Sequence, residues 1–562
     1  MIKTILFLTL ISMSAWASNA DLFADWSKDI RIEEGTNREN VFKLSDTELE
    51  QIKIKGYNHA GNYPVTVTGL LIPYRPLLNF LESNPSNPLR KLFYELGRDL
   101  SGYKSEKQLF EWLGLFENNT QNETGIYKIP YPNGKKDNFY LGAGLVNVNG
   151  VNGLTFSCYT CHANFLFGKV VVGLTNKRPR ANEFFHMARG FVPYIPNAIF
   201  QLGSEATNAE TAMFDRTKKN LVSVGITMPQ VLGLDTSLAQ IALSLNLRNP
   251  DAYATKSKYY EKHPRPNELS RKIVDSKPMP WWNVKYKTRF LSDGSIVQGN
   301  PIYTNFLWNE IGRGTDLVEL EKWMKNNQDK INELTAAVFA TNAPLWTDFF
   351  GMKKIDIERA KRGESIFEVN CSSCHGSYEK AWNAPDEAML SDIDKIKTTK
   401  VVYHEKTPVK DVGTDPARYE GMKYFAEDLN RLAISKTMNT LVVPQKGYVP
   451  PPLVGIWSRY PYMHNNSIPN LCALMTPPAE RPKFFIQGPS VNPNTEYDFD
   501  CVGYPVGDKI PASWKNDRQA FYDTRKPGLS NQGHYKMFLN ADGSELLSAD
   551  EKKDLIEFLK TL

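Results

Sequence analysis

The sequence lacks the features that mark several classes of protein. After the first twenty residues, no stretch approaches the roughly 20 uninterrupted apolar residues that a transmembrane helix needs, so no integral membrane segment is expected. Lysine and arginine are not gathered into a basic stripe, and the formal net charge of +5 is small for 562 residues, which argues against a nucleic-acid partner. No short repeat and no low-complexity segment is visible. The sequence therefore predicts a folded protein that is long enough for at least two hydrophobic cores.

The first residues are the exception to this lack of apolar runs. Lys3 precedes an apolar run over residues 5–17, and the small residues Ser18 and Ala20 follow it. This pattern predicts a secretory signal peptide over residues 1–20. The mature protein is therefore expected in the periplasm or outside the cell.

Cysteine and histidine are scarce, with 6 and 8 copies in the whole chain. Four of these cysteines and two of these histidines nevertheless stand in two pentapeptides with the pattern Cys-x-x-Cys-His, which are residues 158–162 and 371–375. Two cysteines at this spacing can add to the two vinyl groups of one haem while the next residue, histidine, meets the iron. The alternatives are a zinc site or a redox dithiol. Neither requires histidine directly after the second cysteine.

The two motifs predict two covalently bound c-type haems with iron. The cysteines are Cys158 and Cys161 for the first haem, and Cys371 and Cys374 for the second. The proximal iron ligands are His162 and His375. The predicted export agrees, because bacterial c-type haem is attached outside the cytoplasm.

The residues before the two motifs differ. Ala360, Gly363, Phe367 and Cys371 recur at spacings of three and four, so they share one face of a predicted helix, where Gly363 permits close approach of another helix. The approach to the first motif, residues 142–150, is rich in glycine and asparagine and is predicted to be a turn region. The two haems are therefore expected to have different environments and different roles.

The expected fold is mainly α with extensive coil, few short strands and two cytochrome c-like haem domains. Helical patterns are clearest over residues 45–54, 317–334 and 355–370, and in the last turns, where Ser548 and Glu551 form a capping box. One haem per domain predicts an N-terminal haem domain over 21–345 and a C-terminal cytochrome c domain over 346–562. The boundary falls within 341–351.

Two cysteines lie outside the haem motifs. Cys472 and Cys501 form an even pair in an oxidising compartment, which favours a disulfide between them. Two buried free thiols are the alternative.

Taken together, several segments resemble a known group of proteins. The chain resembles the bacterial di-haem cytochrome c peroxidase superfamily, and within it the larger branch that includes the haem-dependent rubber oxygenases. The resemblance covers most of the mature chain and departs from it at Asn466, where glycine is common. The segments that carry it, besides the haem motifs, are residues 156–157, 280–287, 451–457, 460–471, 477–482 and 528–534.

The resemblance implies roles for further residues. His534, in the Ser-Asn-x-Gly-His segment, is implied as the distal ligand of the second haem. His464 is the rival, with a supporting hydrogen-bonding role as its alternative, and Met463 is expected to pack in the core. No distal ligand is evident for the first haem, so its second face is expected to be open. Trp281 and Trp282 are candidates for electron transfer between the haems or for lining a pocket, although packing explains them equally well.

The implied function is that of an oxidoreductase. The C-terminal domain is the electron-transfer candidate and the N-terminal domain the catalytic candidate, where hydrogen peroxide is reduced with electrons from a small cytochrome c or cupredoxin. One alternative is a dioxygen-dependent oxygenase that attacks an apolar substrate. The other is a non-catalytic electron carrier with both irons capped by protein ligands.

Overall fold

A computed structural model describes residues 22–118, 123–130, 140–234 and 238–562 of the chain. The signal peptide predicted over 1–20 lies outside the described residues. Within the described ranges, no helix combines the length and the apolar character needed to cross a membrane.

The described part of the chain is mainly helical, with extensive coil and several small sheets, which confirms the predicted mainly α class. The helices up to residue 345 are α1 (Asp46–Asn62), α2 (Tyr74–Glu82), α3 (Pro88–Ser101), α4 (Glu106–Trp112), α5 (Tyr159–His162), α6 (Ala181–Phe191), α7 (Asn197–Ser204), α8 (Asn208–Leu221), α9 (Leu238–Asn246), α10 (Lys258–Lys262), α11 (Pro301–Gly312), α12 (Leu317–Asn326) and α13 (Gln328–Phe339). The later helices are α14 (Thr347–Phe350), α15 (Ile357–Asn370), α16 (Ser372–His375), α17 (Asp392–Lys395), α18 (Ala417–Gly421), α19 (Ala426–Arg431), α20 (Ala433–Thr437), α21 (Leu471–Leu474), α22 (Pro493–Glu496) and α23 (Ala549–Lys560).

The strands are short and pair antiparallel. One sheet has the order β1-β5-β4, from Ile72–Pro73, Val151–Phe156 and Ala143–Val148. The two-stranded sheets are β2 (Phe116–Glu117) with β3 (Tyr140–Leu141), β6 (Ala163–Leu166) with β7 (Lys169–Val172), β8 (Ile296–Gln298) with β11 (Leu441–Val442), β9 (Ser377–Lys380) with β10 (Thr398–Val402), and β12 (Phe484–Ile486) with β13 (Phe521–Asp523).

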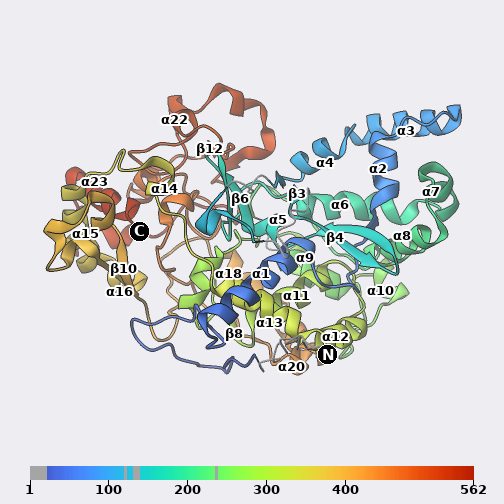
Figure 1. The fold of residues 1–562 in the computed structure, drawn as a ribbon, viewed down its shortest axis with the longest axis horizontal. Helices are drawn as coiled ribbons and strands as arrows, with labels where there is room; N and C mark the ends of the chain where they lie inside the picture. Colours follow the sequence, from blue (N-terminus) through green and yellow to red (C-terminus); the bar gives the residue numbers. More distant parts are fainter. Residues whose placement is uncertain (1–21, 119–122, 131–139, 235–237) are drawn as a thin grey trace, which may run out of the picture.

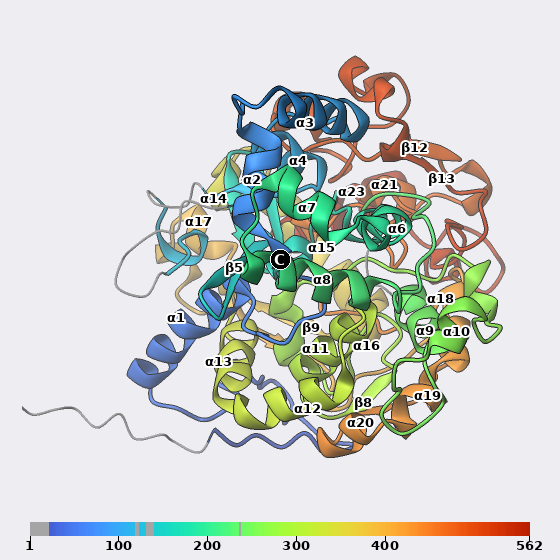
Figure 2. The same cartoon turned by 90° about the vertical axis from the view of Figure 1, so that its right-hand side faces the viewer.

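The two haem motifs lie in different parts of the molecule. Helix α5, which carries the first motif, lies near the centre in Figure 1, whereas α15, α16 and α23 lie toward the left-hand edge. Helices α3 and α4 lie toward the top and α20 toward the bottom in both Figure 1 and Figure 2, with β5 between them in the turned view.

One buried apolar cluster joins residues from both sides of the predicted domain boundary. Leu166 and Trp282 from the N-terminal side pack in the same cluster as Trp346, Trp457 and Phe558 from the C-terminal side. Strand β8 also pairs with β11 across this boundary. The division at residues 345 and 346 stays a prediction, and the two parts share a core.

One sequence prediction of local structure is confirmed with a break in it, and another was wrong. The pattern over 317–334 is two helices, because α12 ends where Asn327 leaves the helical conformation and its side-chain amide donates to the Trp323 carbonyl at 2.8 Å. Residues 142–150 are largely strand β4 rather than a turn region. Its turn to β5 consists of Asn149 and Gly150, with φ of 51° and 83°. Positive φ at both turn residues matches the twist of the strands in a two-residue hairpin.

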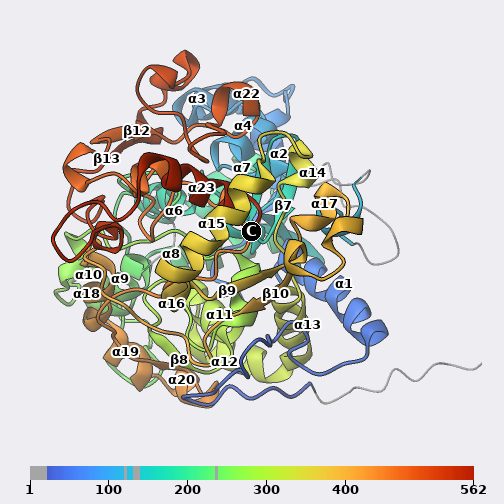
Figure 3. The ribbon, with the colours of Figure 1, turned by 90° about the vertical axis from the view of Figure 1, so that its left-hand side faces the viewer.

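The predicted helix before the second motif is confirmed as α15, and its glycine has the expected role. A side chain at Gly363 would overlap the backbone carbonyl of Asp554 and approach Cβ of Phe558 to 2.9 Å. Helices α15 and α23 pass close together in the view of Figure 3. The capping box of Ser548 and Glu551 at the start of α23 is also confirmed.

We expect Gly363→Ala to destabilise the protein by about 1–3 kcal/mol, because the methyl group forces α15 and α23 apart. Urea-induced unfolding measures the change. Gly190→Ala in α6 is the matched control, since nothing lies within 4 Å of the added carbon. The control is expected to stabilise the helix slightly, and equal losses in both variants would contradict the close-packing explanation.

Candidate haem sites

Strand β5 and the hairpin before it position the first motif. The strand runs to Phe156, two residues before Cys158. The Ser157 N–H donates to the Gly142 carbonyl at 2.8 Å, and the Thr160 hydroxyl donates to the same carbonyl at 2.7 Å. The Cys158 N–H donates to Ala60 of α1 at 3.1 Å. The motif is therefore held by a strand end and a helix rather than by a flexible loop.

A large cavity opens beside this motif, with about 1570 Å³ of empty space, part of it open to solvent. Cys158, Cys161 and His162 all belong to its lining. Most of the other lining residues are apolar, and among the described residues that line it none is Asp or Glu. The polar side chains of the lining include Asn182, Gln240, Lys277, Asn305 and Arg313.

His162 is the only histidine among the described lining residues. Its Nδ1 is buried without a hydrogen-bond partner, and burial lowers its pKa to about 4, against a smaller opposite effect of the Met279 backbone. The ring is therefore neutral, as a metal ligand must be. A buried neutral imidazole next to two cysteines and a large apolar cavity fits a covalently attached haem.

The second motif stands at the end of α15, where α16 carries His375. The Nδ1 of His375 lies 2.8 Å from the Pro451 carbonyl. A carbonyl only accepts, so the proton is on Nδ1 and Nε2 is left with a free lone pair. A backbone carbonyl that fixes the tautomer in this way is typical of metal-binding histidines.

His534 lies opposite His375. Their ring centres are 6.2 Å apart, with 47° between the ring planes. Metal–nitrogen bonds of about 2 Å on both sides of one iron would leave the ring centres roughly 6 Å apart. Burial, and next the charge of His375, lowers the pKa of His534 to about 3, and its Nδ1 has no hydrogen-bond partner. The pair fits an iron between the two rings.

The backbone holds His534 in place. The residue has φ of 59° and precedes the short 3-10 helix η14 (Tyr535–Phe538). Its N–H donates to the Val412 carbonyl at 2.9 Å. A left-handed conformation is uncommon for histidine, so the chain fixes this side chain by a constrained turn.

The two tryptophans lie between the motifs. The Trp281 ring centre lies 5.4 Å from that of His162. Trp282 is fully buried, and its Nε1–H donates to the Val454 carbonyl at 2.9 Å. Val454 lies three residues after Pro451, the residue that accepts from His375. A route of ring contact, peptide bonds and hydrogen bonds therefore joins His162 to His375.

The rival residues His464 and Met463 contact other side chains. His464 is buried and stacks on Tyr448 with ring centres 3.7 Å apart, and burial lowers its pKa well below the usual value. The Met463 sulfur accepts from the Ser467 hydroxyl at 3.8 Å. The His404 Nε2 lies 3.0 Å from the Cys374 carbonyl. His404 therefore supports the second motif through its backbone.

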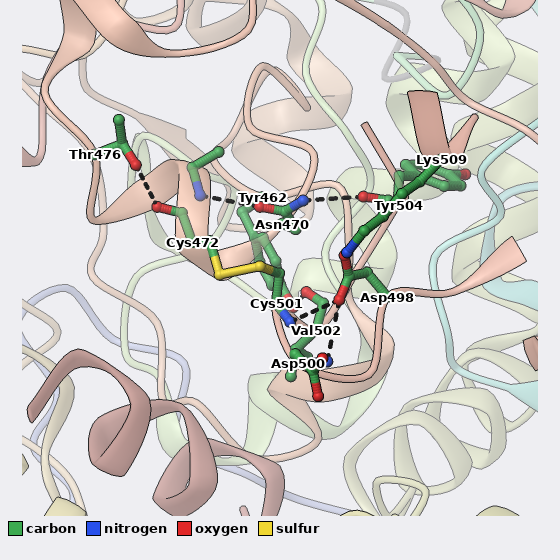
Figure 4. Close-up of a disulfide and its surroundings, with 11 residues drawn as sticks. Tyr462, Asn470, Cys472, Thr476, Asp498, Asp500, Cys501, Val502, Tyr504 and Lys509 are labelled. Atoms are coloured by element: carbon green, nitrogen blue, oxygen red, sulfur yellow. Dashed lines mark hydrogen bonds and ion pairs between the residues drawn. A yellow bond between two sulfur atoms is a disulfide. The ribbon is translucent and has the colours of Figure 1, made fainter. Parts of the chain in front are cut away.

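The predicted disulfide is confirmed, with Cys472 of α21 joined to Cys501 across a sequence separation of 29 residues. Figure 4 shows the bond with its neighbours. The Thr476 hydroxyl donates to the Cys472 carbonyl at 2.8 Å, and the Cys501 N–H donates to the Asp498 carboxylate at 3.0 Å. The disulfide links α21 to the loop that contains Cys501 and Asp498.

We expect the double variant Cys472→Ala, Cys501→Ala to lose about 3.5 kcal/mol of stability, because closing a loop of this length restricts the unfolded chain. Guanidinium unfolding under non-reducing conditions measures the loss. Thiol labelling of the unfolded, unreduced wild-type protein is the companion measurement. A mass gain of two labels would show that the bridge is absent.

Sequence reasoning missed the groups that act through their backbone or through burial. The Pro451 carbonyl carries no side-chain signal, although Pro451 lies in a segment that the resemblance singled out. Individual roles for Lys277, Lys287 and Arg459 near the two sites were also missed, although Lys287 lies in the segment 280–287 that the resemblance singled out.

Comparisons with known proteins agree with a cytochrome. Residues 447–486 match a family described as RoxA-like, cytochrome c-like. A protein of Sinorhizobium fredii named uncharacterized protein y4iJ is 31% identical over 270 residues, covering 39% of this chain and 41% of the relative. A second from the same organism, y4iM, is 29% identical over 220 residues, covering 37% and 49%.

The chain spans less than half the length of these curated relatives. The matched family segment is small, and it contains Pro451 and Arg459 but neither haem motif. It points to the rubber-oxygenase and di-haem cytochrome c group. A cytochrome c-like domain implies a c-type haem, and it indicates a haem-dependent oxidoreductase.

Proposed function

We propose that this protein is an exported oxidoreductase with two covalently bound c-type haems, which acts in the periplasm or outside the cell. Cys158, Cys161 and His162 hold the first haem. Cys371, Cys374, His375 and His534 hold the second. The position of Cys158, Cys161 and His162 in the wall of one large cavity and the 6.2 Å separation of the His375 and His534 rings support this assignment.

The ligand sets support different roles for the two sites. Haem iron supplies redox chemistry when bound, at whichever face the protein leaves open. His534 closes the face opposite His375, which suits electron transfer. No second histidine lines the described cavity beside His162, so that site is proposed to keep an open face. Reaction is therefore proposed at the first motif.

Reduction of hydrogen peroxide is the reaction that the route between the sites supports best. Each peroxide needs two electrons and two protons to give two waters, so electrons must arrive from outside. Trp281 against His162 and Trp282 on the Val454 carbonyl provide a continuous connection to His375. A small cytochrome c or cupredoxin is proposed as the donor to the second haem.

A dioxygen-dependent oxygenase of an apolar substrate is the second candidate. Moving a proton between the oxygens of peroxide normally uses a general acid–base residue. No described residue of the cavity lining is a carboxylate, and the lining is mostly apolar. The RoxA-like match is in line with this candidate.

One experiment separates these functions. The fully reduced protein is mixed anaerobically with hydrogen peroxide, and separately with dioxygen in the presence of rubber latex. A peroxidase oxidises both haems with a stoichiometry of one peroxide per two electrons and turns over with a reduced donor cytochrome. An oxygenase instead consumes dioxygen in proportion to cleaved polymer. A non-catalytic carrier does neither, and that result would contradict the proposal.

A further inference from the structure

Several buried cations near the two sites have no carboxylate partner. Lys287 is 2% exposed, and the contact of its ammonium is the Met279 sulfur at 2.9 Å. Lys277 donates to the carbonyls of Arg459 and Pro461 at 3.1 and 2.5 Å. The Arg459 guanidinium donates to the Pro452 carbonyl at 2.8 Å, and its Nε is buried without a partner. No ion pair joins any of these three to a described residue.

Some other buried cations of the chain have a carboxylate partner, whereas Lys177, Lys380 and Arg248 donate to neutral hydroxyl or carbonyl oxygens. Lys285, 3% exposed and two residues from Lys287, lies 2.9 Å from the Glu39 carboxylate. Arg313, 6% exposed at its side chain, lies 3.5 Å from Glu310. An uncompensated charge in a protein interior is costly, and proteins rarely keep one without a counter-charge. Lys287 differs from these, because the acceptor of its ammonium is a sulfur rather than an oxygen, and its charge therefore indicates that an anion belongs beside it and its neighbours Lys277 and Arg459.

These cations lie between the two haem motifs. Lys277 lines the cavity beside His162, and so does Met279, the partner of Lys287. Arg459 reaches the Pro452 carbonyl, next to the carbonyl that binds His375. Arg459 is also near enough for its charge to lower the pKa of Lys277, Lys287 and His375, after burial. One electrostatic cluster therefore faces both sites.

We propose that Lys277, Lys287 and Arg459 form a carboxylate-binding cluster that takes the propionate groups of the first haem. This proposal rests on the proposed function, because it requires a haem at Cys158–His162. The propionates supply the missing negative charge, and Lys277 is the member of the cluster that reaches them from the cavity wall. The positive charge of the cluster stabilises the electron-rich reduced state and so raises the reduction potential of the first haem.

The first test is spectroelectrochemistry of the holoprotein. Lys277→Met is expected to lower the equilibrium constant for reduction of the first haem at least tenfold, which is about 59 mV for one electron. The propionate-bending band in resonance Raman spectra shifts with it, and Lys277→Arg restores both. Lys285→Met is the matched control, with neither change expected. An unchanged potential and an unchanged band in Lys277→Met would overturn the proposal.

The second test uses the sign of a stability change. Lys287 has only a weak sulfur acceptor, so Lys287→Met removes the charge and hardly any hydrogen bonding. If a propionate compensates the charge, the holoprotein unfolds at a lower temperature in the variant. A higher unfolding temperature would show an uncompensated cation and overturn the proposal.

Two controls keep the alternatives apart. A haem assay of the wild-type protein and of each variant reports whether both haems are attached. If the wild-type protein lacks the first haem, that result refutes the proposed function rather than the carboxylate-binding cluster. Titration of the wild-type protein with acetate reports a soluble anion at the same cations. A shift of the first potential with acetate would overturn the propionate assignment, and no shift supports it.

Discussion

Replacing His534 by alanine is expected to change the second haem from low-spin to high-spin and to open its distal face. The reason is the position of His534, whose ring centre lies 6.2 Å from that of His375 with a buried unpartnered nitrogen. Carbon monoxide bound to the reduced protein should rise from one to two molecules per chain. Electron paramagnetic resonance and carbon monoxide titration measure the two effects.

The matched control is His464→Phe. His464 stacks on Tyr448 at 3.7 Å, so phenylalanine preserves the ring contact while removing both nitrogens. We expect the spin states and the carbon monoxide stoichiometry to stay as in the wild-type protein. A loss of the low-spin signal in His464→Phe, with His534→Ala unchanged, would assign the distal ligand to His464 instead.

Trp282→Phe is expected to slow electron transfer from the second haem to the first. The substitution keeps an aromatic ring in a fully buried site but removes the Nε1–H that donates to Val454 at 2.9 Å. The partly buried Val454 carbonyl, left without its donor, should also lower stability by about 1 kcal/mol. Stopped-flow oxidation of the reduced protein by peroxide measures the transfer rate, and unchanged kinetics would remove Trp282 from the route.

Trp457→Phe is the control that distinguishes a role of Trp282 in electron transfer from a role in core packing. Trp457 is also fully buried, and its Nε1–H donates to the Pro344 carbonyl at 3.0 Å, but it does not lie on the connection between His162 and His375. A similar loss of stability with an unchanged transfer rate is expected. Equal slowing in both variants would show that the effect comes from loosened packing.

The candidate haem motifs and several local contacts could be predicted from the sequence because their patterns span only a few residues. The spacing of Cys371, Cys374 and His375 is a requirement of the cofactor. The close approach at Gly363 and the capping box at Ser548 follow from helix geometry within a few residues. The hairpin turn at Asn149 and Gly150 was equally local and was missed, because glycine and asparagine were taken as loop formers rather than as a hairpin signal.

The contacts that distinguish the two sites were not readable, because they join residues far apart in the chain. The Pro451 carbonyl meets His375 across 76 residues, and no side chain marks that acceptor. Trp281 reaches His162 only once the intervening chain has folded. The missing counter-charge of Lys287 depends on burial, since the neighbouring Lys285 has the same residue type and a carboxylate partner.

The two proposed haem sites differ in that one is capped by two histidines and the other has an open face. The most direct measurement is the electron paramagnetic resonance spectrum of the oxidised wild-type protein before and after addition of cyanide. We predict one low-spin signal, from the haem at His375 and His534, that cyanide leaves unchanged, and a second signal that cyanide converts. Two low-spin signals that both persist in cyanide would show that neither haem has an open face and would indicate a non-catalytic electron carrier.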